Sequence, residues 1–210
     1  AFNSMGSSIA NTYLYSITAL ALILVIGILT SYSAVRRPSV LTAILDTTTM
    51  FPYIIPGSVL GIAMLLAFNH RPLLISGTAL IIIVTYVVRR LPYTIRSSNA
   101  ILRQISPSVE EAALSLGASS PKTFTKITVP MMISGVLPGA LMSWMSIISE
   151  LSASIMLYVG STKTMTISIY TEVIRGNYGV ASALSTILIA STVIVLFLFF
   201  KITGRSEIDL

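Results

Sequence analysis

The chain has 210 residues, of which 54% are hydrophobic and 10% charged, and its mean hydropathy is +0.90. This composition lies outside the range of ordinary soluble domains and indicates a protein embedded in a membrane. Because the chain contains no cysteine, disulfides and thiolate metal sites are excluded.

Five stretches without Asp, Glu, Lys or Arg are long enough to hold a membrane helix, which needs about 17 to 25 residues. In chain order, we expect helices at residues 11–34, 48–68, 73–88, 131–156 and 180–202. Backbone polar groups in lipid must be paired within such a segment. The sequence therefore predicts an all-α fold, a polytopic membrane helix bundle of about five transmembrane helices that forms one domain over residues 1–210.

The second expected span is irregular because it contains Pro52 and the pair Pro56-Gly57. A proline in a membrane helix frees carbonyl groups that neighbouring helices, hydroxyls or water must satisfy, so we expect a kink or a break here. Two interpretations remain open: Pro56 and Gly57 line a translocation pathway, or the kink serves packing alone. Gly57 and Gly61 form a small-xxx-small pair, which allows two helices to approach closely.

A polar connector follows the third expected span, and we assign residues 89–130 to it. Ser106-Pro107 can begin a short helix there, and Gly117 can end it. Pro130 then marks the start of the next membrane segment. The short helix has an apolar stripe at i, i+3, i+4 and i+7, formed by Val109, Ala112, Ala113 and Leu116.

The spacing within this connector resembles the EAA loop of permease subunits of bacterial ATP-binding-cassette importers. That pattern is E-A-A, three residues, G, nine residues, I, one residue and L-P. The matching positions are Glu111, Ala112, Ala113, Gly117, Ile127 and Pro130, with Val129 in place of leucine. In that family the loop is a coupling helix that binds a groove of the cytoplasmic ATPase, so the resemblance implies this role for the six residues. The alternative is an ordinary amphipathic loop helix.

The resemblance also implies the organisation of an assembly. The chain would be one permease unit of the six-helix type, working with two cytoplasmic ATP-binding subunits, a second permease unit (a copy or a fused half) and an external substrate-binding protein. ATP and magnesium would bind the partner ATPase, so this chain would hold no catalytic residue, cofactor or metal. The sequence has no lysine-containing P-loop, no G-x-S-x-G elbow and no H-E-x-x-H helix, as expected for a subunit that is not an enzyme.

The basic residues indicate the orientation in the membrane. With residues 89–130 on the cytoplasmic side, ten lysines and arginines lie inside and three outside, as the positive-inside rule requires. The ten are Arg36, Arg37, Arg89, Arg90, Arg96, Arg103, Lys122, Lys126, Lys201 and Arg205, and the three are Arg71, Lys163 and Arg175. We therefore expect a multi-pass inner-membrane protein with an external N-terminus and a cytoplasmic C-terminus, in contact with lipid. The net charge of +6 then gives no support to nucleic-acid binding.

The first residue is Ala1 rather than an initiator methionine, and the first expected helix starts outside. We therefore expect a fragment, or the second half, of a longer permease.

Glu150, expected near the outer half of the fourth span, is the ionisable residue of greatest interest. A charge at the bilayer centre costs about 2.5 to 3.5 kcal/mol by insertion scales, so the carboxylate is expected to face an interior or water. With Ser149 and Ser152, we assign it to a translocation pathway or gate, where it would attract a cation or order the gate through hydrogen bonds. The alternative is a structural glutamate paired with a neighbouring helix. Residues 150–157 resemble the corresponding segment of ferric-iron and oxyanion permeases.

Residues 160–179 are predicted to form an external hairpin, with a short helix along the outer surface and a Glu172–Arg175 pair. In the resembled family this region helps to form the outer gate and contacts the binding protein. Residues 169–179 resemble iron(III) permeases, so we expect ferric iron as the cargo. The alternatives are the same architecture with an oxyanion, phosphonate, polyamine or thiamine as cargo, or a channel or secondary carrier that works without an ATPase.

Overall fold

The computed structural model describes the backbone of residues 2–203 and the side chains of residues 5–201, and every regular element in this part of the chain is helical. The expected all-α class is therefore confirmed. In chain order, the α-helices are α1 (Phe2–Arg36), α2 (Val40–Thr48), α3 (Phe51–Ile54), α4 (Gly57–Ala67), α5 (Ala79–Gln104), α6 (Pro107–Ser115), α7 (Ser120–Thr123), α8 (Val129–Ile148), α9 (Ser154–Leu157), α10 (Met165–Ile174) and α11 (Tyr178–Thr203). A π-helical turn, Phe124–Thr128, joins α7 to α8, and a 3-10 turn, Gly160–Thr162, precedes α10.

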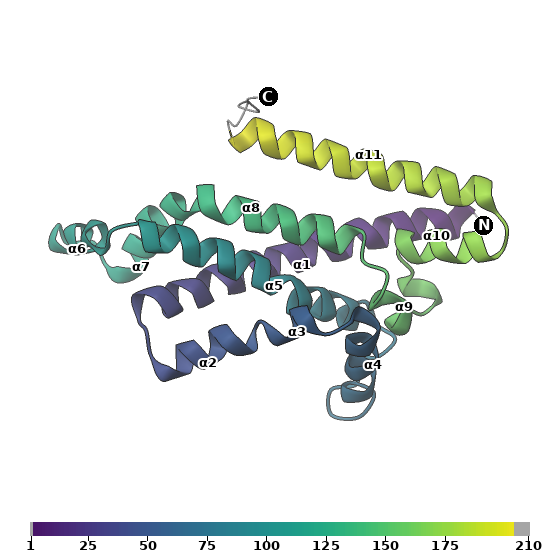
Figure 1. Cartoon of the computed structure of the whole chain (residues 1–210), viewed down its shortest axis with the longest axis horizontal. Helices are drawn as coiled ribbons and strands as arrows, with labels where there is room; N and C mark the ends of the chain where they lie inside the picture. The colour runs from purple at the N-terminus through teal and green to yellow at the C-terminus, as the bar shows by residue number, and fades with distance from the viewer. Residues whose placement is uncertain (1, 204–210) are drawn as a thin grey trace.

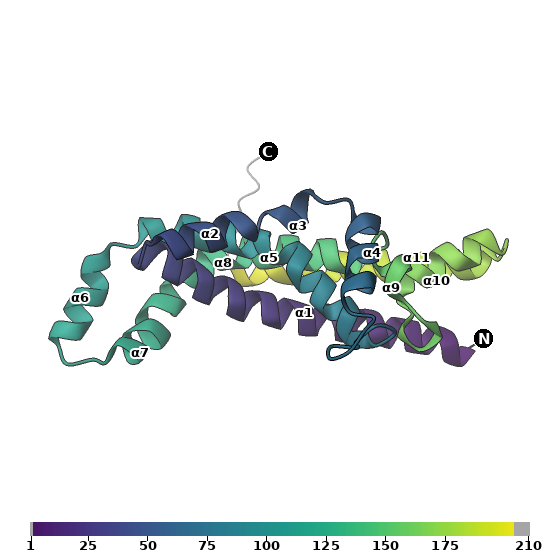
Figure 2. The same cartoon turned by 90° about the horizontal axis from the view of Figure 1, so that it is seen from below.

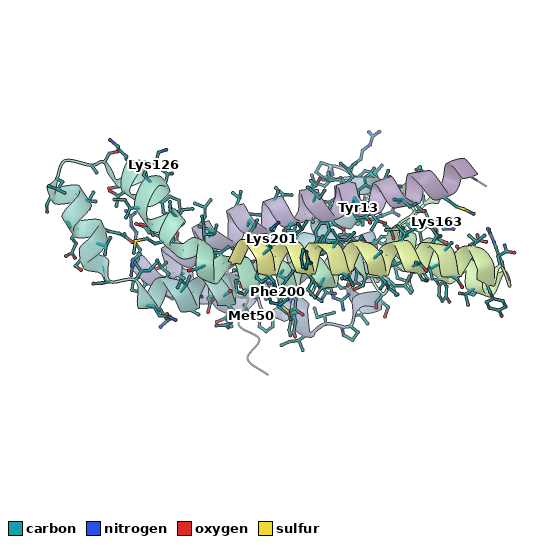
Figure 3. The ribbon with its side chains drawn as sticks, turned by 90° about the horizontal axis from the view of Figure 1, so that it is seen from above. Tyr13, Met50, Lys126, Lys163, Phe200 and Lys201 are labelled. Carbon is teal, nitrogen blue, oxygen red and sulfur yellow. The ribbon has the colours of Figure 1, made fainter. Side chains whose placement is uncertain are left out.

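Helices α1, α5 and α8 lie side by side along the longest axis of the molecule (Figure 1). Helices α6 and α7 lie at one end of this axis, whereas α9, α10 and the beginning of α1 lie at the other, as the perpendicular view in Figure 2 also shows. Helix α11 contacts α10 and α8. The side chains of Lys126 and Lys163 lie towards opposite ends of the molecule (Figure 3).

The main core forms where the apolar faces of α1, α4 and α5 meet. Its buried side chains recur every four or five residues along α1 and the first half of α5, which places them on one face of each helix. They include Tyr15, Ala19 and Ile23 from α1, and Ile81, Ile82 and Tyr86 from α5. A second cluster, nearer α6, joins the end of α5 to α8 through Leu102, Ile105, Met132 and Val136.

Three helical stretches of the described residues are long and apolar enough to cross a membrane: Met5–Arg36, Ser120–Ile148 and Tyr178–Lys201. Val40–Ile54 and Gly57–Ala67 make a fourth if they are counted together as one broken span. The chain bends by 113° between these two parts. The break that the sequence predicts in the second span is therefore confirmed. It falls at Ile55-Pro56, where Pro56 cannot donate the backbone hydrogen bond that would continue the helix.

The third expected span differs from the structure at both ends. It begins at Ala79 rather than near residue 73, and continues without interruption through Arg89 and Arg90 to Gln104. Residues 89–104 therefore belong to a bundle helix, not to the connector expected at 89–130. The buried residues Leu91, Ile95 and Leu102 pack this half of α5 into the molecule. Because of its arginines, α5 is not among the three apolar stretches named above.

The fourth expected span, at residues 131–156, is also displaced. The helical stretch starts at Ser120, because Pro121 occupies a first-turn position and the π-helical turn leads into α8 without a break. It ends at Ile148, and α9 then begins at Ser154 after a break. Pro130 lies in the first turn of α8, as expected, but the π-helical turn makes the helix continuous with the residues before it.

Helices α5 and α8 approach each other closely at Gly135, so replacing this glycine should destabilise the fold. A Cβ at Gly135 would overlap the Cβ of Ile101. We expect Gly135→Ala to lower the free energy of unfolding in detergent by about 1 to 3 kcal/mol, as overpacked cores do. Gly179→Ala is the matched control, because no atom lies within 4 Å of a Cβ added there. Equal melting temperatures for the two variants would contradict the packing described.

Candidate functional site

The break between α8 and α9 contains a buried carboxylate paired with two arginines. The side chain of Glu150 is 3% exposed, and its Oε1 accepts a hydrogen bond of 2.8 Å from Nη1 of Arg89. Its Oε2 accepts one from Nη2 of Arg90. Both arginines lie in the middle of α5, and their side chains are 14% exposed. The cluster of Glu150, Arg89 and Arg90 therefore fastens α5 to the α8–α9 break in a largely dehydrated setting.

Two further hydrogen bonds hold Glu150 in place. The backbone N–H of Ala153 donates to Oε1 at 3.1 Å, and Oγ1 of Thr166 in α10 donates to the Glu150 carbonyl at 2.9 Å. One carboxylate and two guanidinium groups leave the cluster with a charge of +1. Since both carboxylate oxygens already bind guanidinium groups and the local charge is positive, this cluster is unsuited to holding a bare cation.

Helix α4 begins directly against this cluster because its first residue is glycine. A Cβ at Gly57 would overlap Nη1 of Arg89 and lie 2.6 Å from Cβ of Ser152, so a larger residue would force the helix away. One turn later, a Cβ at Gly61 would lie 2.8 Å from the carbonyl oxygen of Ala153. The close approach predicted for Gly57 and Gly61 is confirmed, and their partner is the segment that follows α8.

The structure brings together three of the five residues predicted for the pathway: Gly57, Glu150 and Ser152. Pro56 is the exposed N-cap of α4, next to Gly57. Ser149 lies apart from the charge cluster. It is exposed, donates to the Met145 carbonyl at 2.8 Å, and lines a mostly apolar cavity of about 450 Å³ between α10 and α11.

Arg89 and Arg90 do not belong to the connector expected at residues 89–130, because both lie within α5 and pair with Glu150. Sequence reasoning missed their role although a signal was present. A buried carboxylate needs a cationic partner, and the pair Arg89-Arg90 directly follows the uncharged run at residues 72–88.

At the far end of the molecule, α6 has the predicted start and stop. Pro107 occupies its first turn, and Oγ of Ser106 accepts from the Ser108 N–H. Gly117 follows the helix with a φ of +87°, a conformation that favours glycine. The N–H of Ala118 donates to the Ala113 carbonyl at 3.0 Å and that of Gly117 to the Leu114 carbonyl at 2.9 Å, which completes a Schellman turn.

The apolar stripe expected on α6 is divided between two faces. Ala113 is buried against the bundle, whereas Glu111 and Ala112 are exposed. Leu114 is 45% and Leu116 90% exposed, so two leucines are exposed near the end of this helix. Ile127 is half-buried in the π-helical turn, which contacts α6, and Pro130 is exposed in α8.

Glu110 makes the polar contacts that hold α6 to α1. Its Oε1 lies 2.9 Å from Nε of Arg36, and its Oε2 accepts from the Tyr32 hydroxyl at 3.0 Å. The motif singles out Glu111 for contact with a partner protein, and it carries no information on which carboxylate is bonded within the chain.

The expected Glu172–Arg175 pair is confirmed in α10, where Nη1 of Arg175 lies 2.9 Å from Oε1 of Glu172. The Asn177 amide donates to Oε2 at 2.7 Å. This hydrogen bond, assisted by the charge of Arg175, lowers the pKa of Glu172 below its ordinary value. Within the described residues, no three His, Asp or Glu side chains gather as metal ligands would.

Loss of the Glu150 charge should destabilise the protein strongly. Glu150→Gln leaves Arg89 and Arg90 buried without their counter-ion, and we expect the free energy of unfolding to fall by about 3 kcal/mol or more. Heat denaturation in detergent measures this. Asp46→Asn is the control, because the Asp46–Arg96 contact is 3.5 Å long and Arg96 is 59% exposed, so its effect should stay within about 1 kcal/mol. Equal effects of the two changes would contradict the central place of the cluster.

Several known proteins are similar to this chain. The ferric transport system permease protein FbpB of Actinobacillus pleuropneumoniae is 35% identical over 201 residues, which cover 96% of this chain and 29% of that protein. The putative 2-aminoethylphosphonate transport system permease protein PhnV of Salmonella typhimurium is 29% identical over 154 residues, 73% of this chain and 58% of that protein. The chain thus spans less than two thirds of either relative.

Among solved structures, a chain of the MetNI methionine ABC transporter in inward-facing conformations superposes with a TM-score of 0.73. The match covers 97% of this chain and 94% of that one at 17% identity, so it supports the fold alone. The family model described as "binding-protein-dependent transport system inner membrane component" matches residues 23–206. Because that match takes in nearly the whole chain, this protein belongs to the family of binding-protein-dependent transport system inner membrane components.

Proposed function

We propose that the chain is a translocation unit of an ATP-binding-cassette importer and that ATP is hydrolysed by separate subunits. One observation carries this proposal. Helix α6, with Glu111, Leu114 and Leu116 exposed, lies at the end of the bundle farthest from α10 (Figure 1). Apolar side chains exposed at a helix end are suited to contact with a partner protein, and this helix carries the residues that resemble the coupling loop.

The proposed orientation places α6 in the cytoplasm, and α10 with the beginning of α1 outside. Two ATP-binding subunits would contact α6 of this unit and of a second permease unit, and an external binding protein would deliver cargo at the α10 end. The C-terminus would then be cytoplasmic, since α11 runs from the α10 end towards the α6 end (Figure 1).

Ferric iron is the proposed cargo, supported by the relative named as a ferric permease. The relative named as a 2-aminoethylphosphonate permease favours a phosphonate as the second candidate. For Glu150 we propose a structural role in place of the attraction of a cation that the sequence alone suggested. Because Arg89 and Arg90 occupy both of its oxygens, its part is to hold the break beside α4 and not to bind the ion. Selection of the cargo would then rest with the binding protein.

A change at the exposed end of α6 tests the docking role. We expect Leu116→Asp to reduce the ATPase subunit that co-purifies with the permease about tenfold, as loss of a central apolar contact does, with an unchanged melting temperature. The control is Leu73→Asp, because Leu73 is 62% exposed in the loop before α5. Normal co-purification of the Leu116 variant would contradict a docking role for α6.

The cargo is tested with the complete complex in proteoliposomes. We expect the iron-loaded binding protein to stimulate ATP hydrolysis and iron uptake, and a phosphonate-loaded one to leave both at the basal rate. Stimulation by the phosphonate-loaded protein alone would overturn iron in favour of the second candidate. Cargo uptake that continues without any ATPase subunit would instead indicate a channel or a secondary carrier.

A further inference from the structure

Helix α6 is held to the rest of the chain by very little apolar packing. Ala113 is its one buried residue, and both of its connections are short: Ile105 and Ser106 join it to α5, and residues 116–119 join it to α7. Apolar contact alone therefore leaves the direction of α6 poorly determined, and polar contacts must supply the missing fixed points.

Those fixed points come from the last turn of α1. The guanidinium of Arg36 donates from Nε to Oε1 of Glu110 at 2.9 Å and from Nη2 to the Ile105 carbonyl at 2.8 Å. The hydroxyl of Tyr32, one turn earlier, donates a hydrogen bond of 3.0 Å to the other Glu110 oxygen. The Tyr32 ring packs edge-on against Phe124, with 4.7 Å between the ring centroids. We call Arg36, Tyr32 and Glu110 the inner clamp.

The inner clamp is strong for a site at the end of a molecule. The side chains of Arg36 and Glu110 are only 11% and 12% exposed, and both Glu110 oxygens are bonded. Arg36 also places a cation on the carbonyl that follows α5, and Glu110 lies in the first turn of α6; both positions suit the helix dipoles. The clamp thus joins α1, the end of α5 and α6, and the ring contact adds the π-helical turn before α8.

The opposite end of α1 is fastened to the segment that leads into α10. Nδ2 of Asn11 donates to the carbonyls of Ser161 at 2.9 Å and Lys163 at 3.0 Å, and Oγ1 of Thr12 accepts from the Met165 N–H at 2.7 Å. Thr12 thereby satisfies an amide in the first turn of α10. The two sets of contacts are separated by about 37 Å of helix, taking 1.5 Å per residue from Asn11 to Arg36, and no proline interrupts α1.

We infer that α1 transmits movement of the ATPase-facing helix α6 to the outer segment before α10, and that Arg36, Tyr32 and Glu110 are positioning residues for this step. The inference rests on the proposed importer function, since it assumes an ATPase that moves α6. A single uninterrupted helix bonded at both ends moves as one body, so displacement of α6 displaces residues 161–165 as well. Without the clamp, α6 turns on its two short connections while α1 stays in place.

The first test measures this rigid connection directly. Because the chain has no cysteine, spin labels can be placed on Ser33→Cys at the end of α1 and Ser115→Cys at the end of α6, both exposed positions. In the assembled complex we expect one narrow distance distribution, unchanged by ATP. Adding Arg36→Gln should broaden it. Arg37→Gln, next in the chain and exposed, is the control and should leave it narrow. A distribution that stays narrow in the Arg36 variant overturns the inference.

The second test measures coupling in proteoliposomes. Arg36→Gln should keep the ATPase subunit bound but lower cargo uptake per ATP hydrolysed about fivefold or more, the usual scale of coupling between sites. The milder Tyr32→Phe, which removes one hydroxyl and keeps the ring, should lower it less. The exchange of Arg36→Glu with Glu110→Arg should recover part of the loss, which a merely destabilised protein would not.

The outcomes separate the inference from the function on which it rests. If the unaltered complex shows no ATP-driven uptake, the proposed importer function fails. If the unaltered complex couples normally and Arg36→Gln does so equally well, the importer function stands and the role of the inner clamp is wrong. A charge exchange no better than the single change also overturns the clamp.

Discussion

The cost of an unpaired charge among apolar helices is the constraint on which this structure depends. Glu150 lies in a break between two helices with its side chain almost fully covered, and only its two guanidinium partners make that position tolerable. To provide them, α5 must carry Arg89 and Arg90 through the middle of the bundle. The carbonyl of the same residue accepts a hydrogen bond from Thr166 in α10. The first residue of α4, Gly57, lies against Arg89. The break in the chain after α8 becomes a junction of four elements.

Charge pairing also defines the end of the molecule that faces the proposed motor. There the inner clamp compensates for the poor burial of α6, so a helix with one buried alanine still has a defined direction. Helix α5 is common to both polar sites, because it contributes Arg89 and Arg90 to one and ends at the carbonyl bound by Arg36. The apolar clusters pack the helices between these sites, while the polar sites determine how the helix ends are connected.

Sequence reasoning succeeded where local chemistry suffices. The helix from Ser106-Pro107 to Gly117 needs only a cap, a first-turn proline and a residue that accepts a positive φ, and the break at Pro56 needs only a missing N–H. It failed at Arg89 and Arg90, because counting charges by segment cannot tell an arginine in a loop from one that continues a helix towards a buried carboxylate. It did not predict the contacts of Glu110 for the same reason, since their partners lie 74 and 78 positions away in the chain.

By itself the sequence determined the membrane class, the helical fold, the broken second span and the short helix between Ser106 and Gly117, because hydropathy, proline and glycine act within a few residues. Only the tertiary structure decided that Glu150 is neutralised by α5, that α4 abuts this pair, and that α1 is bonded at both ends. These contacts join residues tens of positions apart, and they form because buried charges and unpaired backbone groups must find partners wherever the packed helices bring them.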